Sequence, residues 1–135
     1  MHPDYIKRCL EEMQGDVQVV YTDFQGLGEW EGMEHKYTGS MEDMKVNQCI
    51  PSTMALCDMR VLDPYGNFKN EAWYEDYEFW LNLYFNRKVN FKHIPEALCY
   101  YRRNKNSRID YLDTKKKEGY DQIREWYGKF NVNPQ

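Results

Sequence analysis

The sequence predicts an α/β domain with a small mixed sheet of three to four strands flanked by helices. Apolar residues at helical spacing mark helices near both ends of the chain, and short β-branched and aromatic runs between them mark strands. Helices and strands that alternate along a chain are typical of α/β folds. The chain of 135 residues has the length of one domain, so residues 1–135 are treated as a single unit around one core.

The first helix is predicted over residues 3–14, because Pro3 suits the first helical position and Gly15 ends the pattern. Its apolar positions at helical spacing are Ile6, Cys9, Leu10 and Met13. A buried strand is predicted over residues 17–24, which are mostly β-branched or aromatic. Residues 25–45 hold several glycines among acidic and aromatic residues, which predicts a long loop with room for a short hairpin.

The middle of the chain is predicted to form short elements separated by turns. Residues 46–57 are mostly apolar but are interrupted by Pro51, which predicts two short extended pieces. Residues 58–62 are predicted to form a helical turn, which the Asp-Pro-Tyr-Gly signal at 63–66 closes. A helix that carries Asp76 follows and runs to about residue 85.

The last third of the chain is predicted to form two strands and a helix. The strands cover residues 89–94 and 97–101, on either side of Pro95. Residues 102–108 form a basic, asparagine-rich loop without apolar periodicity. The final helix is predicted at about residues 110–130. Its apolar positions at helical spacing are Leu112, Tyr120, Ile123 and Tyr127.

Charge and hydropathy exclude two classes of partner. A net charge of −4 and a pI near 5.4 oppose a nucleic-acid-binding surface, which needs a basic stripe. No apolar run reaches the roughly 20 residues of a membrane-spanning helix, and no signal-peptide pattern opens the sequence. We therefore expect no nucleic acid, no membrane span and a cytoplasmic location.

The cysteines and histidines are scattered along the chain. The cysteines, none of them in a Cys-x-x-Cys pair, are Cys9, Cys49, Cys57 and Cys99. Each lies among apolar neighbours, which predicts reduced thiols in the core. His2, His35 and His93 are far apart in sequence and do not indicate a metal site, so none is predicted.

Residues 73–80, Trp-Tyr-Glu-Asp-Tyr-Glu-Phe-Trp, place acidic residues at the start of a predicted helix. At 100° per residue, Asp76 falls on the aromatic side together with Trp80. Glu75 and Glu78 fall on the opposite side. Two interpretations of Asp76 remain open: a structural carboxylate that stabilises the helix start, or a positioned base at the wall of a pocket.

Four short motifs occur in order along residues 3–107. They are Val-Tyr-Thr-Asp at 20–23, Asp-Pro-Tyr-Gly-Asn-Phe at 63–68, Glu-Asp-Tyr-Glu-Phe-Trp-Leu at 75–81 and Ile-Pro-Glu-Ala-Leu-Cys-Tyr-Tyr-Arg at 94–102. Each motif is weak by itself, but the four in register resemble family 2 glycosyltransferases of the GT-A fold. The resemblance implies a partial GT-A fold that contains only the C-terminal, acceptor-side half.

The resemblance also implies an inverting transfer of a sugar from a nucleotide-sugar donor to a hydroxyl of a saccharide acceptor. In this reaction Asp76 is the general base, and Glu75 orients the loop or binds an acceptor hydroxyl. The implied substrate-binding residues are Trp73, Tyr74 and Asn47 for the acceptor and Arg102 and Arg103 for the diphosphate. Gln48 lies beside Asn47 in the implied acceptor-side loop. Core packing is the competing interpretation of the two aromatic residues, and a solvated loop that of the arginines.

The nucleotide-binding half of a complete family member is not recognised, because the sequence has no Asp-x-Asp motif. No cofactor is therefore expected in this chain, although Mn²⁺ or Mg²⁺ is implied for a complete member. Asn104 stands where many members have a metal-contacting His, and an amide is a poor ligand for a transition metal.

Two function classes remain open. The first is an incomplete glycosyltransferase that is inactive as an isolated chain. The second is a non-catalytic module that binds saccharide or protein. In either case, the loss of half a sheet would leave an unpaired edge and an apolar face, so self-association is expected.

Overall fold

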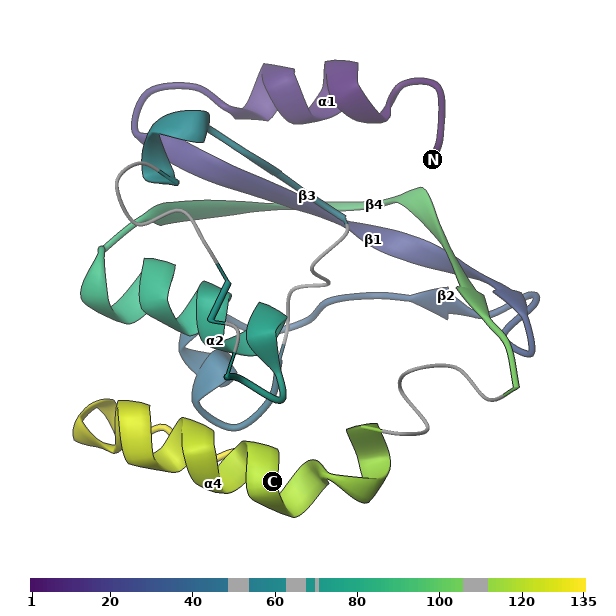
Figure 1. Ribbon diagram of the computed structural model, residues 1–135. Coiled ribbons are helices and arrows are strands. Elements are labelled where there is room, and N and C mark those ends of the chain that lie inside the picture. The colour runs from purple at the N-terminus through teal and green to yellow at the C-terminus, as the bar shows by residue number, and fades with distance from the viewer. Residues whose placement is uncertain (49–53, 63–67, 70, 106–111) are drawn as a thin grey trace.

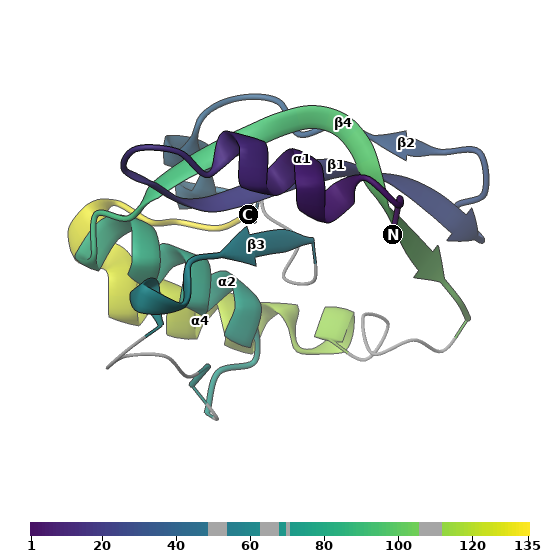
Figure 2. The same ribbon diagram turned by 90° about the horizontal axis from the view of Figure 1, so that it is seen from above.

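The computed structural model describes residues 1–48, 54–62, 68–69, 71–105 and 112–135. In this part of the chain, α1 lies on one face of a four-stranded mixed sheet, and α2 and α4 lie on the other (Figure 1, Figure 2). The helices are α1 (Tyr5–Glu12), α2 (Glu75–Leu81) and α4 (Lys116–Tyr127), and the strands are β1 (Val17–Gly28), β2 (Glu34–His35), β3 (Ala55–Cys57) and β4 (Asn90–Arg103). The predicted α/β class and the size of the sheet are confirmed.

Strand β1 is the centre of the sheet. It pairs in parallel with β4 along its whole length, and its last residue, Gly28, lies opposite Arg103. On its other side, β3 pairs antiparallel with the first half of β1, and β2 pairs with the second half. Strand β1 is longer than the predicted strand at 17–24 because β4 supplies partners for residues 25–28. The antiparallel pairing of β1 with β2 confirms the short hairpin predicted within residues 25–45.

Strand β4 is one continuous strand where the sequence predicted two. Thr22 of β1 lies opposite Ile94, but the next residue, Asp23, lies opposite Ala97. The intervening residues, which include Pro95, form a bulge at which β4 bends (Figure 1). Proline has no N–H to give to the ladder, and a bulge accommodates it without ending the strand.

Helix α1 lies within the predicted span 3–14, but the side that it buries against the sheet is not the one that carries all the predicted apolar positions. Tyr5 and Cys9 are buried against the sheet, whereas Ile6 and Leu10 are 47% and 53% exposed. The expectation that the whole apolar pattern faces the core is therefore wrong for Ile6 and Leu10.

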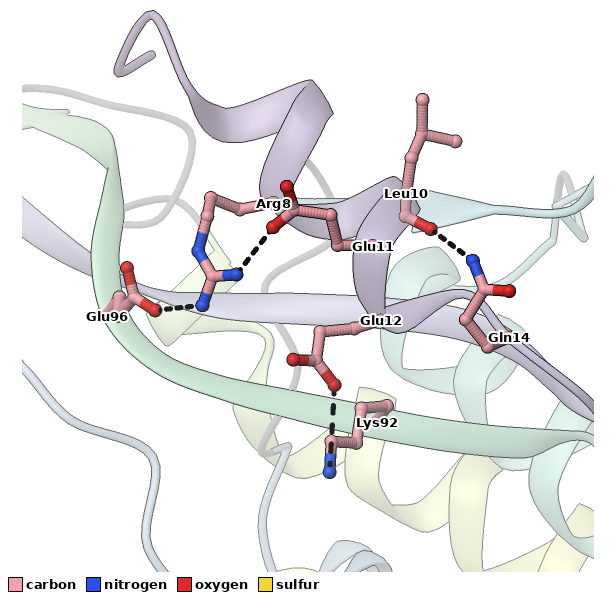
Figure 3. Close-up of polar contacts among 7 residues, drawn as sticks. All are labelled: Arg8, Leu10, Glu11, Glu12, Gln14, Lys92 and Glu96. Carbon is pink, nitrogen blue, oxygen red and sulfur yellow. Dashed lines mark hydrogen bonds and ion pairs between the residues drawn. The ribbon is translucent and has the colours of Figure 1, made fainter.

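Ion pairs to β4 accompany this orientation of α1 (Figure 3). A guanidinium nitrogen of Arg8 lies 2.5 Å from a carboxylate oxygen of Glu96, and the Glu12 carboxylate lies 3.9 Å from Nζ of Lys92. Partly exposed pairs of this kind are screened by solvent and contribute little to stability. They fix the rotation of the helix, while the burial of Tyr5 supplies most of the attachment.

Two hydrophobic clusters lie on opposite faces of the sheet. The cluster under α1 includes Tyr5, Cys9, Val20, Phe24, Ile94 and Leu98. The larger cluster, under α2 and α4, includes Val19, Tyr21, Trp80, Leu81, Ile123 and Tyr127. Val19 and Val20 pack into opposite clusters because successive side chains of a strand point to opposite faces of the sheet. Cys9, Cys57 and Cys99 are free thiols, and Cys49 lies outside the described residues.

The helices on the larger cluster follow the prediction closely. Helix α2 continues into a π-helical turn at Asn82–Asn86, in agreement with the predicted end near residue 85. Helix α4 continues into a 3₁₀ turn at Gly128–Phe130, and its buried Ile123 and Tyr127 were predicted as apolar positions. Of the predicted span 110–130, residues 110 and 111 lie outside the described residues.

The short elements are partly described. Residues Met59–Val61 form the predicted helical turn, whereas the turn signal at 63–66 lies outside the described residues. Of the two extended pieces predicted in 46–57, the second is strand β3. Within the described ranges, no helix combines the length and apolar composition needed to cross a membrane.

Candidate functional site

Asp76 lies in the first turn of α2, where the residue is half-buried. Gln48 donates a side-chain N–H to its Oδ2 over 2.9 Å. The backbone N–H of Tyr77 donates to its Oδ1 over 2.8 Å. Each carboxylate oxygen thus has a hydrogen-bond donor, and the residue remains partly exposed. Asp76 is neither sealed in the core nor bonded to main-chain amides alone.

The resemblance placed both Asn47 and Gln48 in the acceptor-side loop, and the structure brings Gln48 to Asp76. Gln48 follows the 3₁₀ turn at Met41–Lys45, and its amide bridges a separation of 28 residues to reach Asp76. Asn47 is exposed, and its backbone N–H bonds to the carbonyl oxygen of Asp43 over 3.1 Å. The two amide side chains are adjacent in one loop, so sequence could indicate the loop but not which of them faces α2.

The other acids near the start of α2 have different surroundings. Glu75 is half-buried beside Asp76, but Glu78, which the helical pattern placed on the side opposite the aromatic residues, is 2% exposed. Its carboxylate lies 3.0 Å from Nζ of Lys69 and accepts a hydrogen bond from the Tyr127 hydroxyl. Glu78 is buried because α4 packs against α2 on that side and gives α2 a second buried side.

Trp73 and Tyr74 precede α2 and pack against α4. The Tyr74 ring lies 5.3 Å from the Tyr120 ring. The backbone N–H of Trp73 bonds to the side-chain oxygen of Gln122 over 3.2 Å, and Nζ of Lys115 lies 5.5 Å from the Trp73 ring centroid. Burial, followed by nearby acidic groups, raises the pKa of Tyr74 to about 12. These contacts favour the packing interpretation of both residues.

Arg102 and Arg103 lie at the C-terminal end of β4. The Arg103 guanidinium is 5.8 Å from the ring centroid of Trp30, which belongs to the connection between β1 and β2, and Arg102 is exposed. The end of β4 lies away from the start of α2 in both views (Figure 1, Figure 2). The described structure therefore does not bring either arginine to Asp76, and their predicted contact with a diphosphate remains a prediction.

A cavity of about 180 Å³ lies at the other end of α2. Its walls are Glu42, Tyr84, Phe85, Lys88, Val89 and Asn90. Tyr84 is eight residues beyond Asp76, which corresponds to about 12 Å of helix. This cavity is therefore not the pocket wall expected beside Asp76.

A second polar pair, which was not predicted from the sequence, joins β1 to β4. Asp23 is 1% exposed, and its Oδ1 lies 2.8 Å from Nε2 of His93. The backbone N–H of Tyr37 donates to the same oxygen over 2.9 Å. The two side chains are separated by 70 residues, and only the parallel pairing of β1 with β4 brings them together. The one sequence signal was an aspartate near the end of the predicted first strand.

No group of three His, Cys, Asp or Glu side chains converges as a possible metal site among the residues that the structure describes. The divalent metal implied for a complete family 2 glycosyltransferase therefore does not fit this part of the chain, and no chemical step is assigned to it here.

No protein-family model matches the chain, and no curated protein matches it. The resemblance to family 2 glycosyltransferases rests on the sequence motifs alone, and of these the stretch at 63–67 lies outside the described residues.

Proposed function

We propose that this chain is the acceptor-side half of an inverting, family 2-type glycosyltransferase of the GT-A fold, with Asp76 as the general base. The observation that carries the proposal is the environment of Asp76, a half-buried carboxylate with a donor on each oxygen. A catalytic base needs a fixed orientation and access to its substrate. Glu78, in contrast, is buried and paired with Lys69.

The chemistry requires a base because a sugar hydroxyl is a weak nucleophile near neutral pH. In the proposed step, the acceptor oxygen forms a bond to the anomeric carbon of the donor sugar from the side opposite the diphosphate. The bond between that carbon and the diphosphate oxygen breaks, and the nucleoside diphosphate leaves with the bonding electrons. The hydroxyl proton moves to the Asp76 carboxylate, which the Gln48 amide holds in place.

Glu75 is the proposed partner of Asp76 in acceptor binding, since it is adjacent and half-buried. Donor binding is assigned to protein segments beyond these 135 residues, because the sequence has no Asp-x-Asp motif. The isolated chain is therefore expected to bind acceptor saccharides but to bind nucleotide sugars weakly or not at all.

Two measurements test the proposal. In the first, calorimetry with UDP- and GDP-sugars in the presence of Mn²⁺ is expected to detect weak or no binding. Tight, metal-dependent binding would contradict the assignment to the acceptor side.

In the second measurement, the donor half of a GT-A transferase is joined ahead of Met1, and sugar transfer to an acceptor saccharide is assayed. Asp76→Asn is expected to lower transfer by about 10²- to 10⁴-fold while saccharide binding persists. Glu42→Gln is the matched control, because Glu42 is an exposed acid that lines the distant cavity.

The alternative function, a non-catalytic module that binds saccharide or protein, predicts a different result. Such a module would bind its ligand with equal affinity in the wild type and the Asp76→Asn variant, and no fused donor half would give it transfer activity. The packing of Trp73 and Tyr74 against α4 is compatible with both functions, so only transfer by the fused protein separates them.

A further inference from the structure

Asp23 and His93 form a polar pair with aromatic neighbours, and the chemistry proposed for Asp76 does not use it. The His93 ring stacks on Tyr21, with 4.9 Å between centroids and 17° between planes. Tyr37 meets the same ring edge-on at 6.1 Å. Tyr21 belongs to the cluster under α2 and α4, so the pair lies on the face of the sheet that these helices cover.

The hydrogen bond between the two side chains fixes the tautomer of a neutral His93. A carboxylate only accepts hydrogen bonds, so the imidazole donates its Nε2–H to Oδ1 of Asp23. The other ring nitrogen, Nδ1, then carries a lone pair. Oδ1 of Asp23 also accepts from the backbone N–H of Tyr37, while its Oδ2 accepts no hydrogen bond from the described residues.

Neither of the two remaining acceptor atoms is completely enclosed by the described residues. Within the described residues, Trp80 Nε1 is the one buried side-chain polar atom that lacks a hydrogen-bond partner. Nδ1 of His93 and Oδ2 of Asp23 also lack a partner among the described residues, but neither atom is completely enclosed. The side chain of His93 is 23% exposed and that of Asp23 is 2% exposed.

The fold alone does not require this pair. The Tyr37 N–H needs one acceptor oxygen, which an asparagine at position 23 would supply without a buried charge. A histidine whose second nitrogen has no partner adds no further bond to the core. In addition, the bulge in β4 lies opposite Asp23, and bulges often re-aim side chains beside binding sites.

We propose that Nδ1 of His93 and Oδ2 of Asp23 bind hydroxyl groups of a saccharide. Two acceptor atoms require a ligand that donates hydrogen bonds, and the hydroxyl groups of a saccharide supply such donors. The half-buried ring of Tyr37 adds an apolar surface of the kind that packs against the C–H groups of a sugar. The assignment of the ligand as a saccharide rests on the function proposed above.

The test is NMR spectroscopy of the full ¹⁵N-labelled chain, titrated to tens of millimolar with maltotriose, cellotriose or triacetylchitotriose. Long-range ¹H–¹⁵N spectra distinguish the protonated and unprotonated nitrogens of each imidazole. We expect the free protein to show the Nε2–H form of His93. Binding of a saccharide is expected to shift its Nδ1 resonance toward that of a hydrogen-bonded acceptor.

Two variants separate a binding role from a packing role. His93→Phe keeps a flat ring on Tyr21 and removes Nδ1, and we expect it to lower the saccharide affinity about tenfold, the effect of one lost hydrogen bond. His35→Phe is the matched control. His35 also contacts Tyr37, at 4.7 Å between centroids, but it is exposed and has no carboxylate partner among the described residues. The saccharide affinity of the His35→Phe variant should therefore equal that of the wild type.

Shifts confined to Gln48, Asp76 and Tyr77, with an unchanged His93 imidazole, would overturn this inference and leave the proposed function intact. A saccharide-induced shift of the His93 imidazole resonances would support this inference. If, in addition, sugar transfer by the fused protein were unaffected by Asp76→Asn, the proposed function would be overturned while this inference stood. An equal response to butylammonium, which has no hydroxyl group, would overturn the saccharide assignment in favour of a cation site. The absence of any shift would overturn it as well.

Discussion

Nζ of Lys69 lies 3.0 Å from the carboxylate of Glu78, although Glu78 is almost fully buried between α2 and α4. The Tyr127 hydroxyl donates to the same carboxylate. Lys69 also lies 4.3 Å from the ring centroid of Trp126, so its charge is stabilised by an aromatic face as well as by an acid. A buried carboxylate between two helices is thus compensated by a cation from the preceding loop and a hydroxyl from α4.

Removal of the cation should destabilise the protein. Lys69→Met keeps the aliphatic part of the side chain but leaves Glu78 with the Tyr127 hydroxyl as its described side-chain partner. We expect the free energy of unfolding in urea to fall by about 2 kcal/mol. Lys117→Met is the control, because the Lys117–Asp121 pair is at the surface and its loss should have a much smaller effect on the free energy of unfolding. Equal effects of the two variants would contradict the importance of the Lys69–Glu78 pair.

Gly119 allows α4 to approach the residues that precede Asp76. A Cβ atom at this position would lie 2.5 Å from ring carbons of Tyr74 and 3.1 Å from Cβ of Trp73. Gly119→Ala gains about 1 kcal/mol of helix propensity. We nevertheless expect a net loss of about 1–2 kcal/mol, because the aromatic ring must move in a packed interface. The amide resonance of Asp76 should shift, since Tyr74 is two residues away.

Gly128→Ala is the matched control for Gly119→Ala. No atom lies within 4 Å of the position that its Cβ would occupy. Its φ of −56° suits any L-residue. The variant should leave the free energy of unfolding unchanged or raise it by up to about 1 kcal/mol. If both variants were neutral in urea unfolding, the contact between Gly119 and Tyr74 would not limit the packing of α4.

Burial raises the pKa of the Cys57 thiol to about 11. The folded pKa lies above the ordinary thiol value of 9.0, so the protonated thiol contributes stability that is complete below pH 9. This contribution is lost as the pH rises from 9 through 11. In the folded protein, alkylation of Cys57 by iodoacetamide should therefore be slow at pH 8 and should accelerate near pH 11.

Peptide mapping by mass spectrometry gives the alkylation rate of Cys57 separately from those of the other cysteines. The urea-unfolded chain is the control, in which Cys57 should react at the rate of an ordinary thiol at pH 8. An equal rate in the folded protein would show that the thiol is accessible. A Cys57→Ser variant should show a weaker loss of stability between pH 9 and 11.

The local sequence pattern was sufficient to predict elements whose own residues show a clear apolar pattern. The β-branched residues Val19 and Val20 predicted a buried strand, and the periodicity of Ile123 and Tyr127 predicted the buried side of α4. The continuity of β4 through Pro95 could not be predicted, because it depends on a bulge against a strand far away in sequence. A helical wheel treats a helix as having one buried side. It could not predict that Glu78 is buried on the second side of α2, against α4.

The candidate site shows the same division between local and distant information. Asp76 could be identified from the sequence because it is the acidic residue that falls on the aromatic side of the predicted helix. Its partner Gln48 could not, because their hydrogen bond joins a loop and a helix that are 28 residues apart. The pair of Asp23 and His93 was likewise hidden, since strand register decides which residues of β1 and β4 meet.

The predicted self-association is better placed on α1 than on the edge of the sheet. Among the described residues β4 pairs with β1 alone, but its other edge contains Pro95 and a bulge, and both features oppose pairing with another strand. Helix α1, which lies on the outside of the sheet (Figure 2), exposes Ile6 and Leu10 one helical turn apart. An exposed apolar stripe of this kind favours contact with a second copy.

The wild-type chain should therefore sediment as a mixture of monomer and dimer at tens of micromolar. The double variant Ile6→Lys, Leu10→Lys should sediment as a monomer, because each substitution places a solvated charge in the contact. Met59→Lys is the control: Met59 is 72% exposed in the turn after β3, and its replacement should leave the dimer fraction unchanged. A wild-type chain that sediments as a clean monomer at these concentrations would contradict the prediction. If Met59→Lys dissociated the dimer while the double variant did not, the contact would lie at the β3 end of the sheet.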